Sequence, residues 1–244
     1  MRRGFLWMTA LALVTVLLSQ ALGQFWAQSA PAVSSTVAEK AGPLILDAGH
    51  GGEDGGAVSV TGYPESQINL AIVLKMDDIL GLYGTAPILL RSEDISLNDD
   101  GLATMRERKT SDLKNRVKAV QAVEGGTLVS IHQNSFPDGR YHGSQVFYSS
   151  TAGSRELAQH IQEGIRASVQ PDNSREIKKI PDTVYLMNHI DCTAVLVECG
   201  FLTNGAEETR LRDEDYQRKL AAVISAAWLT FWTAEGQNEL GPIA

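Results

Sequence analysis

Short apolar runs alternate along the chain with segments in which apolar residues recur at helical spacing. The runs have the length of buried strands and predict strands at residues 44–47, 87–90, 128–131, 144–148, 184–187 and 194–197. Ile68, Ile72 and Met76 recur at helical spacing and predict a helix from about Glu65 to Leu82. Strands that alternate with helices predict a single α/β domain at residues 43–233, with a twisted, mostly parallel sheet and helices on both faces.

Three more helices are predicted after this first one. Ser154 and Asp213 precede two of them and are expected to cap them. The polar stretch 92–110 predicts a loop with at most a helical turn. The helices are marked by the apolar sets Leu113, Val117, Val120, Val123; Leu157, Ile161, Ile165, Val169; and Leu220, Val223, Ile224, Ala227, Trp228.

The first residues differ from the rest of the chain. Arg2 and Arg3 precede an apolar stretch that runs from about Phe5 to Leu18 and is followed by small residues. This order is typical of an export signal, and a stretch extended to residue 26 is also nearly long enough to span a bilayer once. We expect residues 1–26 to be a cleaved signal or a retained membrane anchor, 27–42 a linker and 234–244 a polar tail.

The composition of the chain limits the classes of function that are compatible with it. Hydrophobic residues make up 43% of the chain and charged residues 20%, as in an ordinary globular protein. The formal net charge of −8 and the absence of a run of Lys and Arg argue against a nucleic-acid partner. Cys192 and Cys199 lie in or beside the apolar run 193–197, which favours buried free thiols over a disulfide, and their spacing is not that of a zinc-binding pair.

Two histidines and a glutamate stand where apolar runs stop. His50 follows LILDAG, His132 follows TLVSI, and Glu198 follows AVLV. The carboxyl ends of parallel strands meet at one edge of a sheet, where open α/β folds build their active sites. Glu65 begins the first predicted helix after a glycine-rich loop, which returns the chain above the same edge. We therefore expect these four side chains to share one site.

Two imidazoles and a carboxylate are a sufficient ligand set for a catalytic zinc that keeps a position open for water. His50, Glu65 and His132 are the candidate ligands of one zinc ion per chain, and Glu198 is the candidate catalytic acid–base residue. A histidine at a strand end can equally be a hydrogen-bonded rim residue, and Glu65 can be an acid favoured by the helix dipole. Glu198 resists such an explanation, because a carboxylate after a buried run costs energy unless it is used or paired. Spacing alone leaves the metal open.

Other residues carry weaker predictions. Gly51 and Gly52 let the backbone pass close to metal or sugar, or form a plain turn. Asn134 either hydrogen-bonds substrate or holds the His132 loop, and Asp47 either orients His50 or caps its strand. His142, His160 and His189 are expected at the surface; Arg175, Lys178 and Lys179 either meet an anionic glycan or form a solvated charge run.

Four ordered segments carry a resemblance to a known family. LILDAGHGGEDGGAV, ESQINL, VSIHQNS and AVLVECGFLTNGAEE resemble the zinc-dependent N-acetylmuramoyl-L-alanine amidases of bacterial cell walls, over about residues 43–232. The resemblance implies that His50, Glu65 and His132 ligate zinc and that Glu198 is the catalytic acid–base residue. It implies peptidoglycan as the substrate, cut between the lactyl group of N-acetylmuramic acid and L-alanine of the stem peptide.

Within this family the chain is most similar to the germination-specific amidases of sporulation, because a bare domain follows the export segment. Those enzymes act on spore-cortex peptidoglycan and remove stem peptides so that muramic-δ-lactam can form. The chain departs from the usual family pattern in two places. Gln133 stands where a small residue is usual, and residues 91–110 are longer and more acidic than the loop often found there.

Two other functions share part of this pattern. A non-catalytic wall-binding or regulatory domain would require loss of a ligand or of the base, and all four positions are filled. A zinc peptidase of wall crosslinks would share the metal chemistry without explaining the ordered motifs. We expect an exported enzyme of the cell wall or spore cortex, with a membrane contact through residues 1–26, and a rim with few glycan-binding features is compatible with an accessory protein.

Overall fold

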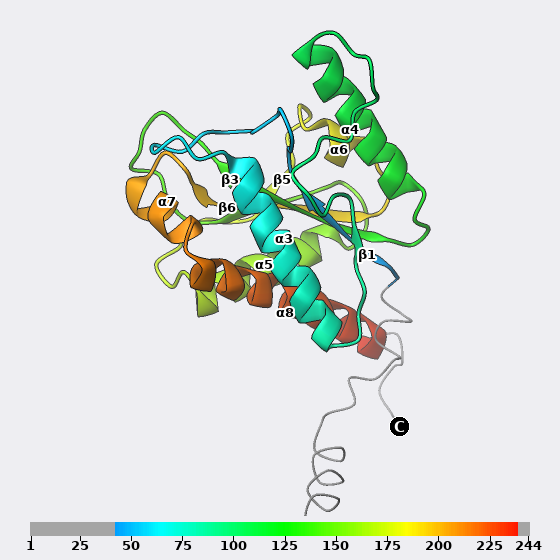
Figure 1. The fold of residues 1–244 in the computed structure, drawn as a ribbon. Helices are drawn as coiled ribbons and strands as arrows, with labels where there is room; N and C mark the ends of the chain where they lie inside the picture. The colour runs from blue at the N-terminus through cyan, green and yellow to red at the C-terminus, as the bar shows by residue number, and fades with distance from the viewer. Residues whose placement is uncertain (1–41, 239–244) are drawn as a thin grey trace, which may run out of the picture. The chain divides into compact units, whose positions relative to one another are not determined.

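The computed structural model describes residues 42–238, with side chains through Trp232 (Figure 1). Residues 1–41, which include the predicted export segment and nearly all of the predicted linker, lie outside the described residues. No helix in the described range is both long and apolar enough to cross a membrane.

Six strands form one sheet in the order β2-β1-β3-β6-β4-β5. β1 pairs in parallel with β2 and β3, β3 with β6, and β5 with β4, whereas β4 runs antiparallel to β6. The mostly parallel sheet predicted from the sequence is therefore confirmed. The strands are β1 (Leu44–Ala48), β2 (Ile88–Leu89), β3 (Thr127–Asn134), β4 (Gln145–Tyr148), β5 (Lys178–Lys179) and β6 (Thr193–Phe201).

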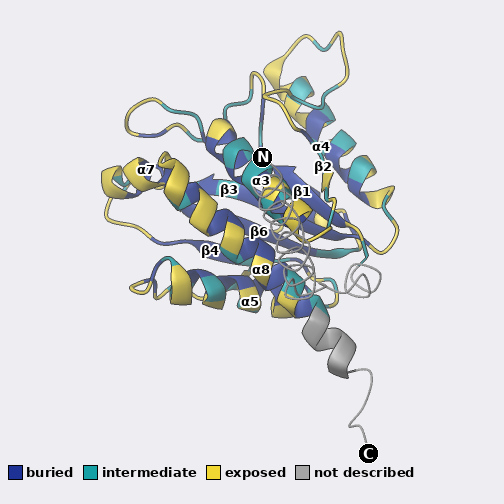
Figure 2. Cartoon of the chain, turned by 60° about the horizontal axis from the view of Figure 1, so that its bottom comes forward, coloured by how far each residue is buried: buried dark blue, intermediate teal, exposed yellow. Residues whose placement is uncertain are grey.

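Helices cover both faces of this sheet. One face packs against α3 (Glu65–Leu82), α5 (Ser154–Ser168) and α8 (Glu214–Asn238), and the other against α4 (Met105–Gln121) and α6 (Tyr185–Asn188). A short helix, α7 (Gly205–Leu211), follows β6. The central strands are dark blue between the helical layers in Figure 2.

Side chains of the central strands alternate between two apolar cores. In β1, Leu44 and Leu46 belong to the core shared with α3, α5 and α8, while Ile45 belongs to the core beneath α4 and α6. Every residue of β1 is buried. Burial on both faces explains why this strand appears in the sequence as a continuous apolar run rather than as an alternating pattern.

Several predicted elements differ from the structure. Residues 184–187, predicted as a strand, lie almost wholly in α6, because a run of four apolar residues fits a buried helical turn as well as a strand. α4 begins at Met105, inside the stretch predicted as a loop, where Thr104 and Glu107 form a capping box.

Some of the predicted helix ends and caps agree with the structure and others do not. The α3 bounds are confirmed, and the Asp213 carboxylate accepts a hydrogen bond from Tyr216 N at 2.8 Å, as expected of a cap. Ser154 is wrong as a cap: Gly153 holds that position, and the Ser154 hydroxyl instead accepts a hydrogen bond from Ala194 N at 2.9 Å. α8 continues through Asn238, so the first part of the predicted polar tail is helical.

Both cysteines are free, as expected. Cys199 is buried in the larger core and Cys192 is half-buried beside the other. Burial raises the pKa of both thiols, which disfavours the reactive thiolate.

Candidate metal centre

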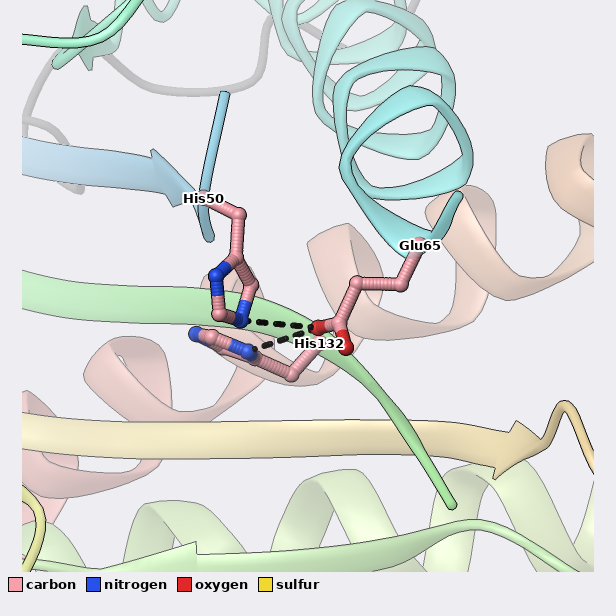
Figure 3. Close-up of side chains that lie close together, drawn as sticks. All are labelled: His50, Glu65 and His132. Carbon is pink, nitrogen blue, oxygen red and sulfur yellow. Dashed lines mark hydrogen bonds and ion pairs between the residues drawn. The ribbon is translucent and has the colours of Figure 1, made fainter. Parts of the chain in front are cut away.

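His50, Glu65 and His132 converge above the carboxyl ends of the parallel strands. His50 lies just after β1, Glu65 is the first residue of α3, and His132 lies near the end of β3. Their side chains point toward one another in Figure 3. One ligand atom from each residue lies within 4.8 Å of the other two, so this cluster could hold a metal ion.

The Glu65 carboxylate is the centre of the cluster. Its Oε1 lies 3.0 Å from Nδ1 of His132 and 3.3 Å from Nε2 of His50. Its Oε2 accepts a hydrogen bond from Ala57 N at 2.7 Å, which fixes the rotation of the carboxylate. Burial alone would raise the pKa of Glu65, but the hydrogen bonds with His132 and His50 outweigh burial and lower it well below its usual range.

The His50 ring is oriented from its other nitrogen. Nδ1 of His50 lies 2.9 Å from Oδ2 of Asp54, so the Nδ1–H donates to that carboxylate. The neutral ring then presents the lone pair of Nε2 to Oε1 of Glu65, and two lone pairs at 3.3 Å repel unless a proton or a metal cation lies between them. The donor atoms, two imidazole nitrogens and a carboxylate oxygen, are those that zinc prefers, so the cluster fits this metal.

A proton and a metal ion would compete for the position between Nε2 of His50 and Oε1 of Glu65. Burial would lower the pKa of His50, but the hydrogen bonds to Asp54 and Glu65 outweigh burial and raise it to about 9. The surroundings of the ring therefore favour positive charge at this point of the molecule.

Glu198 lies on β6 directly opposite His132 of β3. It lines a cavity of about 310 Å³ together with His50, His132 and Lys109. Its Oε2 is buried and has no hydrogen-bond partner among the described residues. Burial raises the pKa of Glu198 to about 7, so the carboxylate is poised to exchange protons near neutral pH.

Asp54 is a residue that the sequence analysis missed. It also accepts a salt bridge from Lys109 of α4 at 2.8 Å and a hydrogen bond from Gly56 N at 3.2 Å. Of the two alternatives for Asp47, orientation of the His50 ring is wrong: Asp47 pairs with Arg116 and accepts a hydrogen bond from Ser130 at 2.6 Å. The signal for Asp54 was its place four residues after His50, within the glycine-rich loop.

The glycines of the loop have packing roles. A Cβ on Gly51 would lie 2.3 Å from Ile95 O, and one on Gly52 would lie 2.9 Å from Ser96 N. A Cβ on Gly56 would lie 2.6 Å from Cγ of Glu65 and 2.7 Å from Cδ2 of His50. The absence of a side chain at Gly56 therefore leaves room for both Glu65 and His50. Substrate contact by Gly51 or Gly52 stays a prediction.

Other predicted positions lie outside this cluster. Asn134 ends β3, where its carbonyl accepts a hydrogen bond from Leu202 N at 2.8 Å, and its contact with substrate stays a prediction. The Arg175 guanidinium donates to His142 O at 2.7 Å and stacks over the Phe201 ring, a structural role that leaves its contact with glycan untested. The other residues of these sets are exposed, as surface positions should be: His142, His160, His189, Lys178 and Lys179.

Residues 44–229 match the family described as N-acetylmuramoyl-L-alanine amidase. The chain belongs to this family of enzymes. It is 34% identical over 194 residues to the germination-specific N-acetylmuramoyl-L-alanine amidase of Bacillus subtilis, an alignment that covers 79% of this chain and 81% of the relative. It is 28% identical to the amidase LytC of Bacillus subtilis, over 83% of this chain and 39% of that protein.

Solved structures of amidases share this fold. The CwlD amidase from Clostridioides difficile, solved in complex with the GerS lipoprotein, superposes with a TM-score of 0.76 at 38% identity, covering 79% of this chain and 99% of that one. An N-acetylmuramoyl-L-alanine amidase from Clostridium difficile 630 gives a TM-score of 0.68 at 29% identity, covering 81% of this chain and 100% of that one. The resemblance inferred from the sequence, including the similarity to the germination-specific branch, is confirmed.

Gln133 occupies a position where the resemblance to the family led us to expect a small residue. The buried side chain donates from Nε2 to Oδ1 of Asn69 at 3.1 Å. Asn69 in turn donates to Oε1 of Glu65 at 3.2 Å. The longer side chain thus extends the hydrogen-bonded support of Glu65 instead of disturbing it.

Replacing Gly56 with alanine tests this packing. Gly56→Ala places a methyl group against Glu65 and His50, and Gly62→Ala is the matched control, because Gly62 also has a positive φ but no atom within 4 Å of an added Cβ. Both substitutions should cost about 1 to 2 kcal/mol of stability from backbone strain, and Gly56→Ala should cost more because its methyl group also meets Glu65 and His50. Only Gly56→Ala should reduce the metal content, measured by atomic emission on the folded protein, and equal metal content in the two variants would contradict the packing role.

Proposed function

We propose that this amidase hydrolyses the bond between the lactyl group of N-acetylmuramic acid and L-alanine of the stem peptide, with one zinc ion held by His50, Glu65 and His132. The observation that carries the proposal is the cluster of these three donors in a chain of the amidase family. Zinc bound there supplies a Lewis acid and lowers the pKa of a water molecule. No other group in the cluster would provide that chemistry.

Glu198 would move the protons. Glu198 lines the same cavity as His50 and His132, where its carboxyl group can accept a proton from the attacking water. The same carboxyl group then gives that proton to the nitrogen of the departing L-alanine as the amide C–N bond breaks. The carbonyl carbon keeps the water oxygen, so the lactyl group stays on the sugar as a carboxylate. The stem peptide leaves as an amine that also takes up the second proton of the water.

The competing functions are less well supported. A non-catalytic wall-binding domain would not need a buried carboxylate without a partner beside the metal ligands. A peptidase of wall crosslinks would share the donor set, but the relatives at 34% and 28% identity are named as N-acetylmuramoyl-L-alanine amidases.

We further propose that the enzyme acts outside the cytoplasm on spore-cortex peptidoglycan. The relative of Bacillus subtilis named as germination-specific and the similarity to CwlD support this role. Residues 1–26, with their basic start and apolar stretch, would direct export, either as a cleaved signal or as a retained anchor. Because CwlD was solved in complex with the GerS lipoprotein, an accessory protein is part of the proposal.

Digestion of purified peptidoglycan with the zinc-loaded chain tests the bond that is cut. Mass analysis should find free stem peptides that begin at L-alanine, and a chelator-treated sample should release none until zinc is added back. Fragments cut within the stem or between sugars would overturn the amidase proposal. Full turnover without any added protein would remove the accessory partner from it.

Glu198→Gln should retain zinc and lose about 10²- to 10⁴-fold in kcat, because the amide cannot take up and return the proton. Zinc content and turnover are measured on the same sample. Glu163→Gln, an exposed glutamate of α5, is the matched control and should leave both unchanged. Activity that survives in Glu198→Gln would show that another group is the base.

Deletion of the gene should remove muramic-δ-lactam from the spore cortex, measured by muropeptide analysis. The intact chain should restore the lactam, whereas a chain that lacks residues 1–26 should not, because it would stay inside the cell. An unchanged cortex in the deletion strain would exclude the sporulation role. Restoration by the shortened chain would exclude export through this segment.

A further inference from the structure

The backbone of His50 is held in an unusual conformation. Its φ of 62° makes it the one non-glycine residue with a positive φ in the described part of the chain. Gly51 and Gly52, which follow it, also have positive φ values. A side chain disfavours this left-handed region, and such strain persists only where the surroundings hold it. The first candidate ligand therefore depends on contacts that fix the turn after β1.

A buried guanidinium group supplies one of these contacts. Arg116 of α4 donates from Nη2 to His50 O at 2.8 Å and from Nη1 to Ala48 O at 3.1 Å. It is only 2% exposed and pairs with the Asp47 carboxylate and, from Nε at 2.7 Å, with the Asp112 carboxylate. The planar group thus has acceptors on all three nitrogens, which leaves its orientation little freedom.

A second arginine holds the neighbouring carbonyls. Arg91 donates to Ala48 O at 2.8 Å and to Gly49 O at 3.1 Å, and it reaches Ser66 O of α3 at 2.8 Å. Each of the three carbonyls from Ala48 to His50 therefore accepts a hydrogen bond from a guanidinium group. Arg91 connects this turn to α3, on which Glu65 lies, and Arg116 connects it to α4.

The contacts from α4 come from one face of that helix. Lys109, Asp112 and Arg116 are spaced by three and four residues and so project from the same side. Lys109 binds Asp54, the carboxylate that orients the His50 ring, while Arg116 binds the His50 backbone. α4 therefore acts on the ring and on the main chain of the same ligand.

We propose that Arg116 is a positioning residue of the metal centre: by binding the His50 carbonyl from α4, it holds the strained turn that aims the His50 ring at Glu65. This inference rests on the proposed zinc site. The guanidinium group touches neither metal nor substrate, so its effect should appear in metal affinity and coordination geometry rather than in a chemical step. Lysine keeps the charge but cannot span His50 O, Asp47 and Asp112 together.

Arg116→Lys tests the proposal by zinc affinity, measured on the purified chain in competition with a chromophoric chelator. We expect about 10- to 100-fold weaker binding, the range found when groups that orient metal ligands are lost. The visible spectrum of the Co²⁺-substituted variant should also change, because the His50 donor is displaced. Thermal unfolding of the metal-free protein gives the stability change separately.

Arg166→Lys is the matched control. Arg166 of α5 also binds two backbone carbonyls, Asn173 O and Arg175 O at 2.8 Å each, and one carboxylate, that of Glu176, but none of these belongs to the metal centre. This variant should lose stability without any change in zinc affinity or Co²⁺ spectrum. Equal effects on zinc affinity in the two variants would overturn the proposal, because Arg116 would then act only through general stability.

A milder variant covers the case in which Arg116→Lys does not fold. Asp112→Asn leaves Arg116 in place but replaces the acceptor of its Nε–H, and it should weaken zinc binding in the same direction. Unchanged zinc affinity and Co²⁺ spectrum in the folded variants would overturn this inference alone. A wild-type chain that binds no zinc would overturn the proposed metal site itself, and this inference with it.

Discussion

The contact of one carboxylate oxygen with two imidazoles brings three distant parts of the chain together. Oε1 of Glu65 lies 3.0 Å from His132 and 3.3 Å from His50, so the start of α3 lies at the ends of β1 and β3. None of the three segments can shift without breaking this contact. The glycine-rich loop that precedes α3 must therefore follow a narrow path, and Gly56 allows it to pass directly against two of the three side chains.

A gain in folding stability does not explain why charged side chains are buried next to this contact. Asp47, Arg91 and Arg116 are at most 2% exposed. Removing such groups from water costs free energy, and pairing them often does no more than offset that cost. Apolar residues of similar size would often give a protein of equal stability. What the buried groups provide is directional hydrogen bonding to main-chain carbonyls, which apolar packing cannot give. They lie where the chain leaves β1, so their hydrogen bonds fix the conformation of the turn that carries His50.

Much of the fold and four residues of the centre could be predicted from the sequence, because each carries a local signal. α3 has clear helical periodicity, and His50, His132 and Glu198 stand at or just after the ends of apolar runs. α6 could not be distinguished from a strand, because four apolar residues are too few to show a period. The α4 start could have been found from Thr104 and Glu107, which stand at capping-box spacing.

The residues that hold the metal ligands in place could not be predicted from the sequence, for a different reason. Arg116 meets Asp47 across 69 positions and His50 across 66, and no local pattern marks either pair. The chain has 21 Lys and Arg and 29 Asp and Glu residues, so the number of conceivable pairs is large. Only the topology, which places α4 over the end of β1, selects among them. The same holds for Glu65 and His132, whose meeting follows from the fold rather than from spacing.

The pairing of His132 with Glu198 across β3 and β6 has a consequence for how the sequence can vary in length. Alternate residues of a strand face opposite sides of the sheet, so the insertion or loss of one residue within β3 or β6 would turn one of the two side chains to the wrong face. The surface segments around residues 92–104 and 135–143 are under no such restriction. Natural variation in length should therefore concentrate in these loops, around strands whose length is fixed by the chemistry at their ends.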